Sequence, residues 1–219
     1  NGKFNKIDVD SLNVTVIPIR VVVEKQIQQP PRFSVDVAPD EFDIKMIRWA
    51  STSPTGKYIV YQALGKLYRK DMATGKVRRL TKQNSHDEFY PSFSRDGKSI
   101  VYTSWSDDKL GSVKVINITG GIGKTISTEP GVYIEPKFSP SGDRVVFRRL
   151  AGGYLLSPEW SMEPGVYIAD LREKTMEKIM GSGFNAHFSA SEERIYFTNY
   201  VPMSKYTELE LCSVDLSGE

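Results

Sequence analysis

The sequence contains little of the chemistry on which several protein classes depend. Its single cysteine, Cys212, excludes an internal disulfide and a cysteine-cluster metal site. Its only histidines, His86 and His187, lie far apart in the chain, whereas a usual zinc site draws ligands at short spacing. No apolar run approaches the ~18 residues that a membrane-spanning helix needs. We therefore expect no metal, no cofactor and no membrane span.

The charge balance also excludes some partners. The 29 basic and 27 acidic residues leave a net charge of +2, which gives no electrostatic reason to expect binding to nucleic acid or to an anionic membrane. The chain opens on Asn1 without an initiator methionine or a signal-like segment, so we expect a segment of a longer protein. Its 219 residues suffice for one large core or for an array of small repeats.

One pattern recurs four times along the chain. Each copy has an aromatic or apolar start, a serine, a turn and then an apolar strand, and the copies cover residues 49–61, 90–102, 134–147 and 185–197. The turn positions are Gly56, Gly97, Gly142 and Glu192, with spacings of 41, 45 and 50 residues. A period of about 40–50 residues indicates a repeat architecture. Because Glu replaces Gly in the fourth copy, that copy predicts a turn of a different type.

Each repeat is expected to form four antiparallel strands. In residues 46–81, strand-like segments are separated by tight-turn sequences, and the charged segment 77–81 suits an exposed edge. No stretch shows sustained helical periodicity. Four acidic residues fall at the end of a third strand, just before a turn, where we expect them to accept hydrogen bonds from turn amides: Asp8, Asp71, Asp170 and Asp215.

The predicted fold class is an all-β protein, a β-propeller of four-stranded antiparallel blades with about four complete or near-complete blades and a partial one. Residues 1–20 are assigned to a partial blade and residues 21–45 to a crossing loop. Three blades follow at 46–81, 82–127 and 128–180, and an incomplete blade covers 181–219. The chain could close a ring by pairing its first two strands with its last three, or form an arc of a larger propeller. The arc is favoured, since closure requires the first strand pair to reach the last blade.

The repeated turn resembles the WD40-like repeat of TolB-type propellers. The residues that carry the resemblance are Ser53–Lys57, Ser94–Lys98 and Ser139–Arg144. The stretch Tyr90–Asp108 resembles more particularly the propeller part of amidohydrolase-family proteins with a TolB-like domain. This resemblance implies a bacterial, exported and periplasmic protein. It also implies that metal ligands and catalytic acids lie in a separate hydrolase domain, whose motifs this chain does not contain.

Other candidate motifs favour structural roles. The segment Gly120–Thr125 resembles a phosphate-binding loop, but Ile118 occupies the position of the first required glycine and a strand follows in place of a helix, so a hairpin turn is expected. No Gly-x-Ser-x-Gly elbow is present. The acidic pairs Asp107-Asp108 and Glu192-Glu193 are expected in solvated loops. The sequence thus predicts no catalytic, metal or cofactor residue.

Propeller topology places the binding surface. The connections between second and third strands and between blades open on one face, and here they are long: 20–45, 82–89, 103–111, 148–165 and 198–208. We call this surface the loop face. Its residues of types favoured at interfaces, with one neighbouring acid, are Trp105, Asp107, Arg148, Arg149, Tyr154, Trp160, Tyr200 and Tyr206. They are predicted either to bind a partner or to pack the loops down.

The function expected from the sequence is a noncatalytic module for protein interaction or substrate gating within a larger exported hydrolase of the amidohydrolase type. Its partner would be the remainder of the same polypeptide. Two alternatives remain open. One is a stand-alone TolB-like periplasmic propeller that binds envelope proteins. The other is the gating propeller of a prolyl-oligopeptidase-like serine peptidase.

Overall fold

The computed structural model describes residues 2–28, 30, 32–33, 36–151, 163–202 and 207–218. It separates the chain into two compact units, Asn1–Phe42 and Asp43–Glu219. Strands are the only regular elements of the described residues, and these residues contain no helix able to cross a membrane. The all-β prediction is confirmed.

The first unit contains one β-hairpin. Strands β1 (Phe4–Ile7) and β2 (Val14–Ile17) pair antiparallel, with Phe4 opposite Ile17. All eight strand residues are exposed. A two-stranded hairpin without a packed face is marginally stable at best in water.

The second unit contains four antiparallel sheets in chain order, which we call blades 1 to 4. Blades 1, 2 and 3 have four strands, and blade 4 has three. Blade 1 consists of β3 (Arg48–Thr52), β4 (Tyr58–Ala63), β5 (Lys66–Asp71) and β6 (Val77–Arg79). Blade 2 consists of β7 (Asp87–Phe93), β8 (Ser99–Ser106), β9 (Leu110–Asn117) and β10 (Lys124–Thr125). Blade 3 consists of β11 (Val132–Phe138), β12 (Arg144–Leu150), β13 (Gly165–Asp170) and β14 (Thr175–Met180). Blade 4 consists of β15 (Phe184–Phe188), β16 (Arg194–Pro202) and β17 (Thr207–Asp215).

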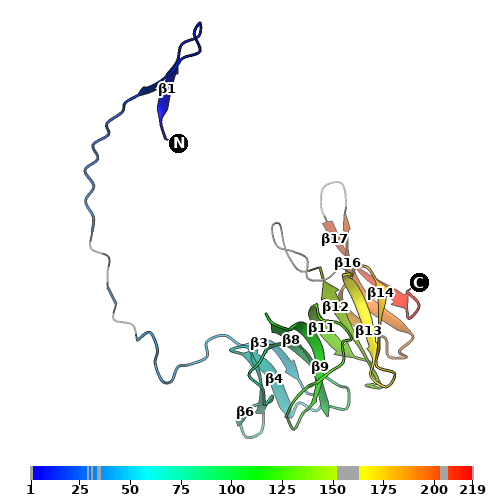
Figure 1. Ribbon diagram of the computed structural model, residues 1–219. Helices are drawn as coiled ribbons and strands as arrows, with labels where there is room; N and C mark the ends of the chain where they lie inside the picture. Colours follow the sequence, from blue (N-terminus) through cyan, green and yellow to red (C-terminus); the bar gives the residue numbers. More distant parts are fainter. Residues whose placement is uncertain are drawn as a thin grey trace. The chain divides into compact units, whose positions relative to one another are not determined.

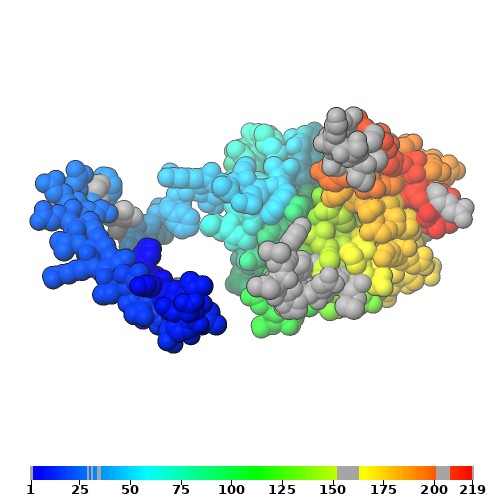
Figure 2. Space-filling view, turned by 90° about the horizontal axis from the view of Figure 1, so that it is seen from above, coloured from blue at the N-terminus to red at the C-terminus, as the bar shows by residue number. Residues whose placement is uncertain are grey.

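The blades pack face to face in chain order (Figure 1). Strand β3 contacts β7, β7 contacts β11, and β11 contacts β15, so these four first strands are neighbours; we call them the inner strands. Figure 2 shows the same succession within residues 43–219, as the colours pass from cyan through green and yellow to red. This stacking of four-stranded sheets confirms the predicted propeller arrangement.

Apolar side chains fill the spaces between blades. Tyr102 and Leu67 belong to a buried cluster shared by blades 1 and 2, and Phe147 belongs to one shared by blades 2 and 3. Ile195 is buried in a cluster of blades 3 and 4. Each sheet buries its faces only against its neighbours, which is why the repeats stabilise one another.

The recurrent serine holds the turn between the first and second strands of every blade. In blade 1, Ser53 Oγ accepts a hydrogen bond from the amide of Tyr58 at 3.0 Å, and Gly56 donates its amide to the Ser53 carbonyl at 2.8 Å. The equivalent serines of the other blades accept the same side-chain bond: Ser94, Ser139 and Ser189. A glycine with positive φ completes the turn at Gly56, Gly97 and Gly142.

The prediction of a different turn in blade 4 is wrong. Glu192 adopts φ 63° and donates its amide to the Ser189 carbonyl at 3.1 Å, as the glycines do in the other three blades. Its carboxylate accepts a bond from the Ser141 hydroxyl at 3.0 Å and lies 3.1 Å from Nη2 of Arg144. Glu192 also accepts the Ser141 amide, so contacts with blade 3 accompany its strained backbone. The expectation of a solvated loop is therefore wrong for Glu192.

The turn aspartates behave as predicted. Asp71 Oδ1 accepts the amides of Ala73 and Thr74, and Asp170 Oδ1 accepts those of Arg172 and Glu173. At the two remaining positions, Asp8 Oδ1 accepts the amide of Ser11 and Asp215 Oδ1 accepts that of Ser217. Hydrogen bonds from the turn backbone lower the pKa of Asp71 and of Asp170.

The loop face is less irregular than the sequence suggests. Strand β8 continues to Ser106 and β9 starts at Leu110, so the predicted loop 103–111 is mostly a β-hairpin with a short turn. Strands β16 and β17 likewise extend through most of 198–208, and β12 continues to Leu150. Cross-strand pairing continues beyond the buried core, so these segments are strands despite their polar composition.

Candidate functional site: the inner-strand pocket

Every inner strand contains a β-bulge at the same point of the repeat. The pairing with the second strand shifts between Arg48 and Ser51 in blade 1, and at the corresponding place in the other three blades. One residue at each bulge has a left-handed backbone: Trp49 (φ 47°), Tyr90 (φ 52°), Glu135 (φ 56°) and Asn185 (φ 53°). Left-handed backbone is costly for a bulky residue and often marks a functional position.

These four bulge residues meet in one pocket. It has a volume of about 400 Å³ and is lined by Trp49, Ala50, Ser51, Tyr90, Pro91, Glu135, Pro136, Lys137 and Asn185. All come from inner strands, one set from each blade. We call this hollow the inner-strand pocket. Bulges reorient side chains that a regular strand would direct elsewhere, and here they bring four blades to one site.

One side of the pocket is aromatic. The rings of Trp49 and Tyr90 lie 4.5 Å apart, and Phe89 meets Trp49 edge-on at 5.6 Å. Both Trp49 and Tyr90 are half-buried and line the pocket. Burial raises the pKa of Tyr90, with a further contribution from the Glu135 carboxylate, so the phenol is neutral and can donate a hydrogen bond at neutral pH.

The other side of the pocket is polar. Glu135 Oε2 accepts the amide of Asn185 at 3.0 Å and lies 3.8 Å from Nη1 of Arg148. The Arg148 guanidinium also stacks over Phe184, 4.5 Å from its ring centre. Lys137 contributes an amine to the pocket lining. The carboxylate is therefore held between two blades by groups that fix its position.

This combination favours recognition over catalysis. Aromatic faces, a fixed carboxylate, an amine and an amide can bind a polar or aromatic side chain of a partner. In the described lining, no nucleophile forms a hydrogen bond with a general base. Within the described ranges, no group of three or more His, Cys, Asp or Glu residues could hold a metal ion.

The structure separates the predicted loop-face residues into groups. Arg148 lies next to the inner-strand pocket, and Tyr200 meets Phe184 edge-on at 5.0 Å, so these two residues share an aromatic neighbour. Trp105 donates its indole N–H to Asp107 at 3.0 Å at the β8–β9 hairpin. The prediction that all of them form one binding surface stays untested.

Arg149 has a different environment from its neighbour Arg148. It is buried, pairs with Glu129 at 2.8 Å, and stacks near Tyr133 and Tyr167. Successive residues of a strand point to opposite faces, so the side chains of Arg148 and Arg149 leave β12 on opposite faces of blade 3. The remaining candidates lie outside the described residues: Tyr154, Trp160 and Tyr206.

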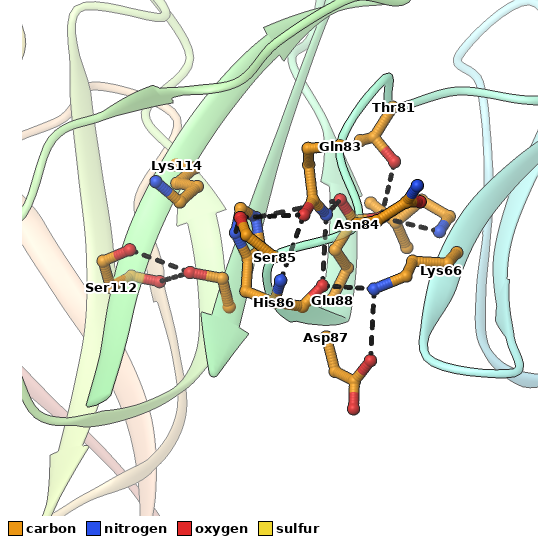
Figure 3. A network of polar contacts seen from close by, with 12 residues as sticks. Lys66, Thr81, Gln83, Asn84, Ser85, His86, Asp87, Glu88, Ser112 and Lys114 are labelled. Carbon is orange, nitrogen blue, oxygen red and sulfur yellow. Dashed lines mark hydrogen bonds and ion pairs between the residues drawn. The ribbon is translucent and has the colours of Figure 1, made fainter. Parts of the chain in front are cut away.

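The two histidines also lie apart. His187 is exposed on β15, where its ring lies 6.0 Å from that of Tyr196. His86 precedes β7 and belongs to the polar network in Figure 3. At the centre of this network is Glu88, which is fully buried and accepts hydrogen bonds from the Leu67 amide and the Thr81 hydroxyl, each at 2.8 Å. Gln83 donates a further bond to Glu88.

The segment that resembles a phosphate-binding loop is a hairpin turn, as predicted. Gly120 and Gly121 both have positive φ and connect β9 to β10. A β-carbon at Gly120 would lie 2.5 Å from the carbonyl oxygen of Leu80, which explains glycine at that position.

The sequence contains one signal for the inner-strand pocket, the spacing of its four bulge residues. Trp49, Tyr90, Glu135 and Asn185 recur with the same 41, 45 and 50-residue spacings as the turn positions, seven residues before each. The four residues are two aromatics, an acid and an amide, so the repeat predicts equivalent places without indicating a common site. Only the bulges and the stacking of the blades show that these residues meet.

No protein-family profile matches the chain. It is similar to the Tol-Pal system protein TolB of Francisella tularensis subsp. mediasiatica (strain FSC147), with 28% identity over 134 residues, which covers 61% of this chain and 29% of that protein. The same-named protein of subsp. holarctica (strain OSU18) is 29% identical over 123 residues, covering 55% of this chain and 26% of that protein. The aligned part therefore spans less than a third of these relatives.

Solved structures show the same fold. The crystal structure of TolB from Acinetobacter baumannii matches with a TM-score of 0.58 and 20% identity, covering 76% of this chain and 40% of that one. The nidogen/laminin complex contains a chain that matches with a TM-score of 0.54 and 12% identity, covering 71% of this chain and 57% of that one. Together with the stacked four-stranded blades and their serine-held turns, these similarities show that the chain is a TolB-like β-propeller.

Proposed function

We propose that this chain is a protein-interaction module of an exported bacterial protein, and that it binds a segment of another envelope protein through the inner-strand pocket. Similarity to proteins of a Tol-Pal system supports a role among proteins of the cell envelope. The observation that carries the proposal is the convergence of four strained bulge residues, one from each blade, on one pocket.

The chemistry of the pocket fits a protein ligand. Trp49 and Tyr90 supply aromatic faces, which are enriched at the energetic centres of interfaces. Glu135 and Lys137 supply opposite charges that can orient a bound segment. A volume of about 400 Å³ is enough for a few side chains of a partner, rather than for a folded domain.

An alternative source of the partner is a hydrolase domain of the same polypeptide. The resemblance of Tyr90–Asp108 to the propeller part of amidohydrolase-family proteins favours it, and Tyr90 is itself a bulge residue. In this case the pocket holds a segment of the hydrolase and the propeller controls access to it. Catalytic groups would then come from the second domain.

Photo-crosslinking in the source bacterium tests the proposal. A photoreactive amino acid replaces Asn185, an exposed residue of the pocket lining, and the crosslinked product is identified by mass spectrometry. The matched control places the same group at Val77, which is exposed on edge strand β6. We expect a defined crosslink from position 185 to a periplasmic protein, and none from position 77.

The variant Trp49→Ala should weaken this crosslink at least about tenfold, since an aromatic anchor of an interface contributes about 2 kcal/mol or more. A crosslink within the same polypeptide would favour the hydrolase-linked alternative. Equal crosslinking from positions 185 and 77, or none from either, would contradict the proposed binding site. Recovery of the protein in the cytoplasmic fraction would contradict the proposed export.

A further inference from the structure

A second cavity lies on blade 2, away from the inner-strand pocket. It has a volume of about 310 Å³ and shares no lining residue with that pocket. Its walls are the segment before β7, the β8–β9 hairpin and the segment after β10. The lining residues are Ser85, His86, Ser104, Ser106, Lys109, Leu110, Gly111, Ser112, Lys114, Thr125, Ser127, Thr128, Glu129 and Pro130. We call it the blade-2 cavity.

The two lysines of this cavity form no ion pair with a carboxylate among the described residues. These lysines are Lys109 and Lys114. The one acidic residue of the lining, Glu129, pairs with Arg149 at 2.8 Å. The basic groups of the lining are therefore available to a ligand.

Two acidic residues of β7 lie near the cavity without lining it. Asp87 pairs with Lys66 at 3.2 Å. The buried Glu88 carboxylate accepts hydrogen bonds from Leu67, Thr81 and Gln83, and its Oε1 lies 3.9 Å from Nε2 of His86. Figure 3 shows Ser112 and Lys114 on β9, and Ser85 and His86 on the segment before β7.

Several hydroxyl groups of the lining can also donate to a ligand. Ser106 Oγ accepts the Lys109 amide, Ser127 Oγ accepts the Val113 amide, and Thr125 Oγ1 accepts Lys114 Nζ at 2.7 Å. Within the described part of the chain, none of these three hydroxyls donates a hydrogen bond. Their protons therefore remain available in a cavity that already contains two amines.

His86 adds a polar atom without a partner. Its Nδ1 lies 3.2 Å from Ser85 Oγ, but its buried Nε2 has no hydrogen-bond partner among the residues that the structure describes. Burial, together with the charges of Lys114 and Lys66, lowers the pKa of His86 to about 4. Burial likewise lowers the pKa of Lys114, Glu88 opposes this change, and Lys109 adds to it. An anion in the cavity would offset the repulsion among these groups.

We propose that the blade-2 cavity is an oxyanion-binding site, which takes the carboxylate or phosphate group of a small ligand between Lys109, Lys114 and the hydroxyls of Ser106, Thr125 and Ser127. Amines and hydroxyls are the donors that such groups accept from. The cavity is at the lower end of the size range of small-molecule sites, so the ligand is small. The site is independent of the inner-strand pocket and of any protein partner.

Imidazole NMR tests the site directly, because His86 lines the cavity while His187, the only other histidine, lies on β15. The protein is titrated with inorganic phosphate and, separately, with acetate, at constant pH and at an ionic strength fixed with sodium chloride. We expect a saturable shift of the His86 signals and no shift of the His187 signals. Tighter binding of phosphate identifies a phosphate site, and tighter binding of acetate identifies a carboxylate site.

The variant Lys114→Met removes the charge but keeps most of the aliphatic stem, and it should weaken binding about tenfold. Lys70→Met is the matched control, since Lys70 is exposed on β5 and does not line the cavity. Ser127→Ala, which removes a smaller group, should weaken binding less than Lys114→Met. Saturating phosphate should also raise the pKa of His86 by about one unit.

Shifts of His86 and His187 that are equal and do not saturate would overturn the proposal, since they indicate a general salt effect. Equal loss of affinity in Lys114→Met and Lys70→Met would overturn it as well. The melting temperature of each variant is measured alongside. If Lys114→Met proves unfolded, the affinity of Ser127→Ala for phosphate and acetate becomes the test. Unchanged affinity in that variant would reject the site.

Discussion

Two positions with left-handed backbone recur in every blade, and they differ in the residue types that occupy them. At the turns between first and second strands, glycine occupies the position in three of four blades: Gly56, Gly97 and Gly142. At the inner-strand bulges no blade uses glycine, although the φ values are similar. Where only the turn must form, the residue without strain is present. Where the side chain lines a pocket, the strain is retained.

The largest expected effect concerns the turns. Gly142→Val introduces a β-branched residue at φ 81° and should lower the free energy of unfolding by about 2 kcal/mol, although a β-carbon there meets no neighbour within 4 Å. Gly181→Val is the control, since Gly181 also has open space around it but no positive φ. Urea unfolding measures both. Equal losses in the two variants would show that backbone strain at the turns is not the reason for glycine.

The dependence of unfolding free energy on pH distinguishes the contribution of His86 from that of the turn aspartates. His86, at the entry to inner strand β7, has its pKa lowered from 6.5 to about 4 by burial and then by Lys114 and Lys66. Between these values the unfolded chain binds a proton that the folded chain does not, so the free energy of unfolding should fall by roughly 1–2 kcal/mol from pH 7 to pH 4. The aspartates of the turns have lowered pKa values, so their contribution is lost only at lower pH, as they become protonated in the folded protein.

Urea unfolding at several pH values checks this prediction. His86→Gln should remove most of the fall between pH 6.5 and pH 4, while His187→Gln, at an exposed position, should leave it unchanged. The loss below pH 4 should persist in both variants. If His86→Gln keeps the full dependence between pH 6.5 and pH 4, the fall does not originate at this strand entry.

A smaller effect is expected at a bulge. Tyr90→Gly relieves a strain of about 1 kcal/mol but removes a half-buried ring that lies 4.5 Å from Trp49. The net loss of unfolding free energy should be about 1 kcal/mol, with a clear loss of the position-185 crosslink. A more stable variant with the crosslink intact would mean that the tyrosine serves neither packing nor binding.

The smallest effect is expected at Glu192, the exception among the turns. Burial acts to raise its pKa, but hydrogen bonds from Ser141 and Arg144 outweigh burial and lower the pKa. Glu192→Gly removes these contacts and the backbone strain together, so the unfolding free energy should change by less than about 1 kcal/mol. A double-mutant cycle with Ser141→Ala measures the coupling, and its absence would show that the inter-blade contact does not offset the strain.

Much of the fold was accessible from local sequence. Each turn between the first and second strands depends on a serine five positions before the amide that it bonds and on a turn residue three positions after that serine. The turn aspartates accept amides two or three residues away. Such contacts lie within one hairpin, so a pattern of a few residues specifies them. The period of the repeat then predicted blades, because a twisted sheet must bury its faces against a neighbour.

The inner-strand pocket could not be predicted in the same way. Loop length indicates Trp105 and Arg149 as surface residues, but their recorded partners lie within blades 2 and 3. Trp49 and Glu135 carry no such indication, because the sequence of an isolated strand gives no sign of a bulge. At Glu192 the missing glycine predicts a different turn, whereas contacts with blade 3 accompany a glutamate in the same turn.

The all-β class, the period of the blades and the chemistry of their turns follow from the amino-acid sequence alone, because they depend on contacts between residues close in the chain. Which side chains meet at the inner-strand pocket and in the blade-2 cavity follows only from the three-dimensional arrangement of the blades. Both sites are lined by segments that are distant from one another in the chain. Their geometry depends on the bulges and on the stacking of the blades, and no local sequence pattern specifies either.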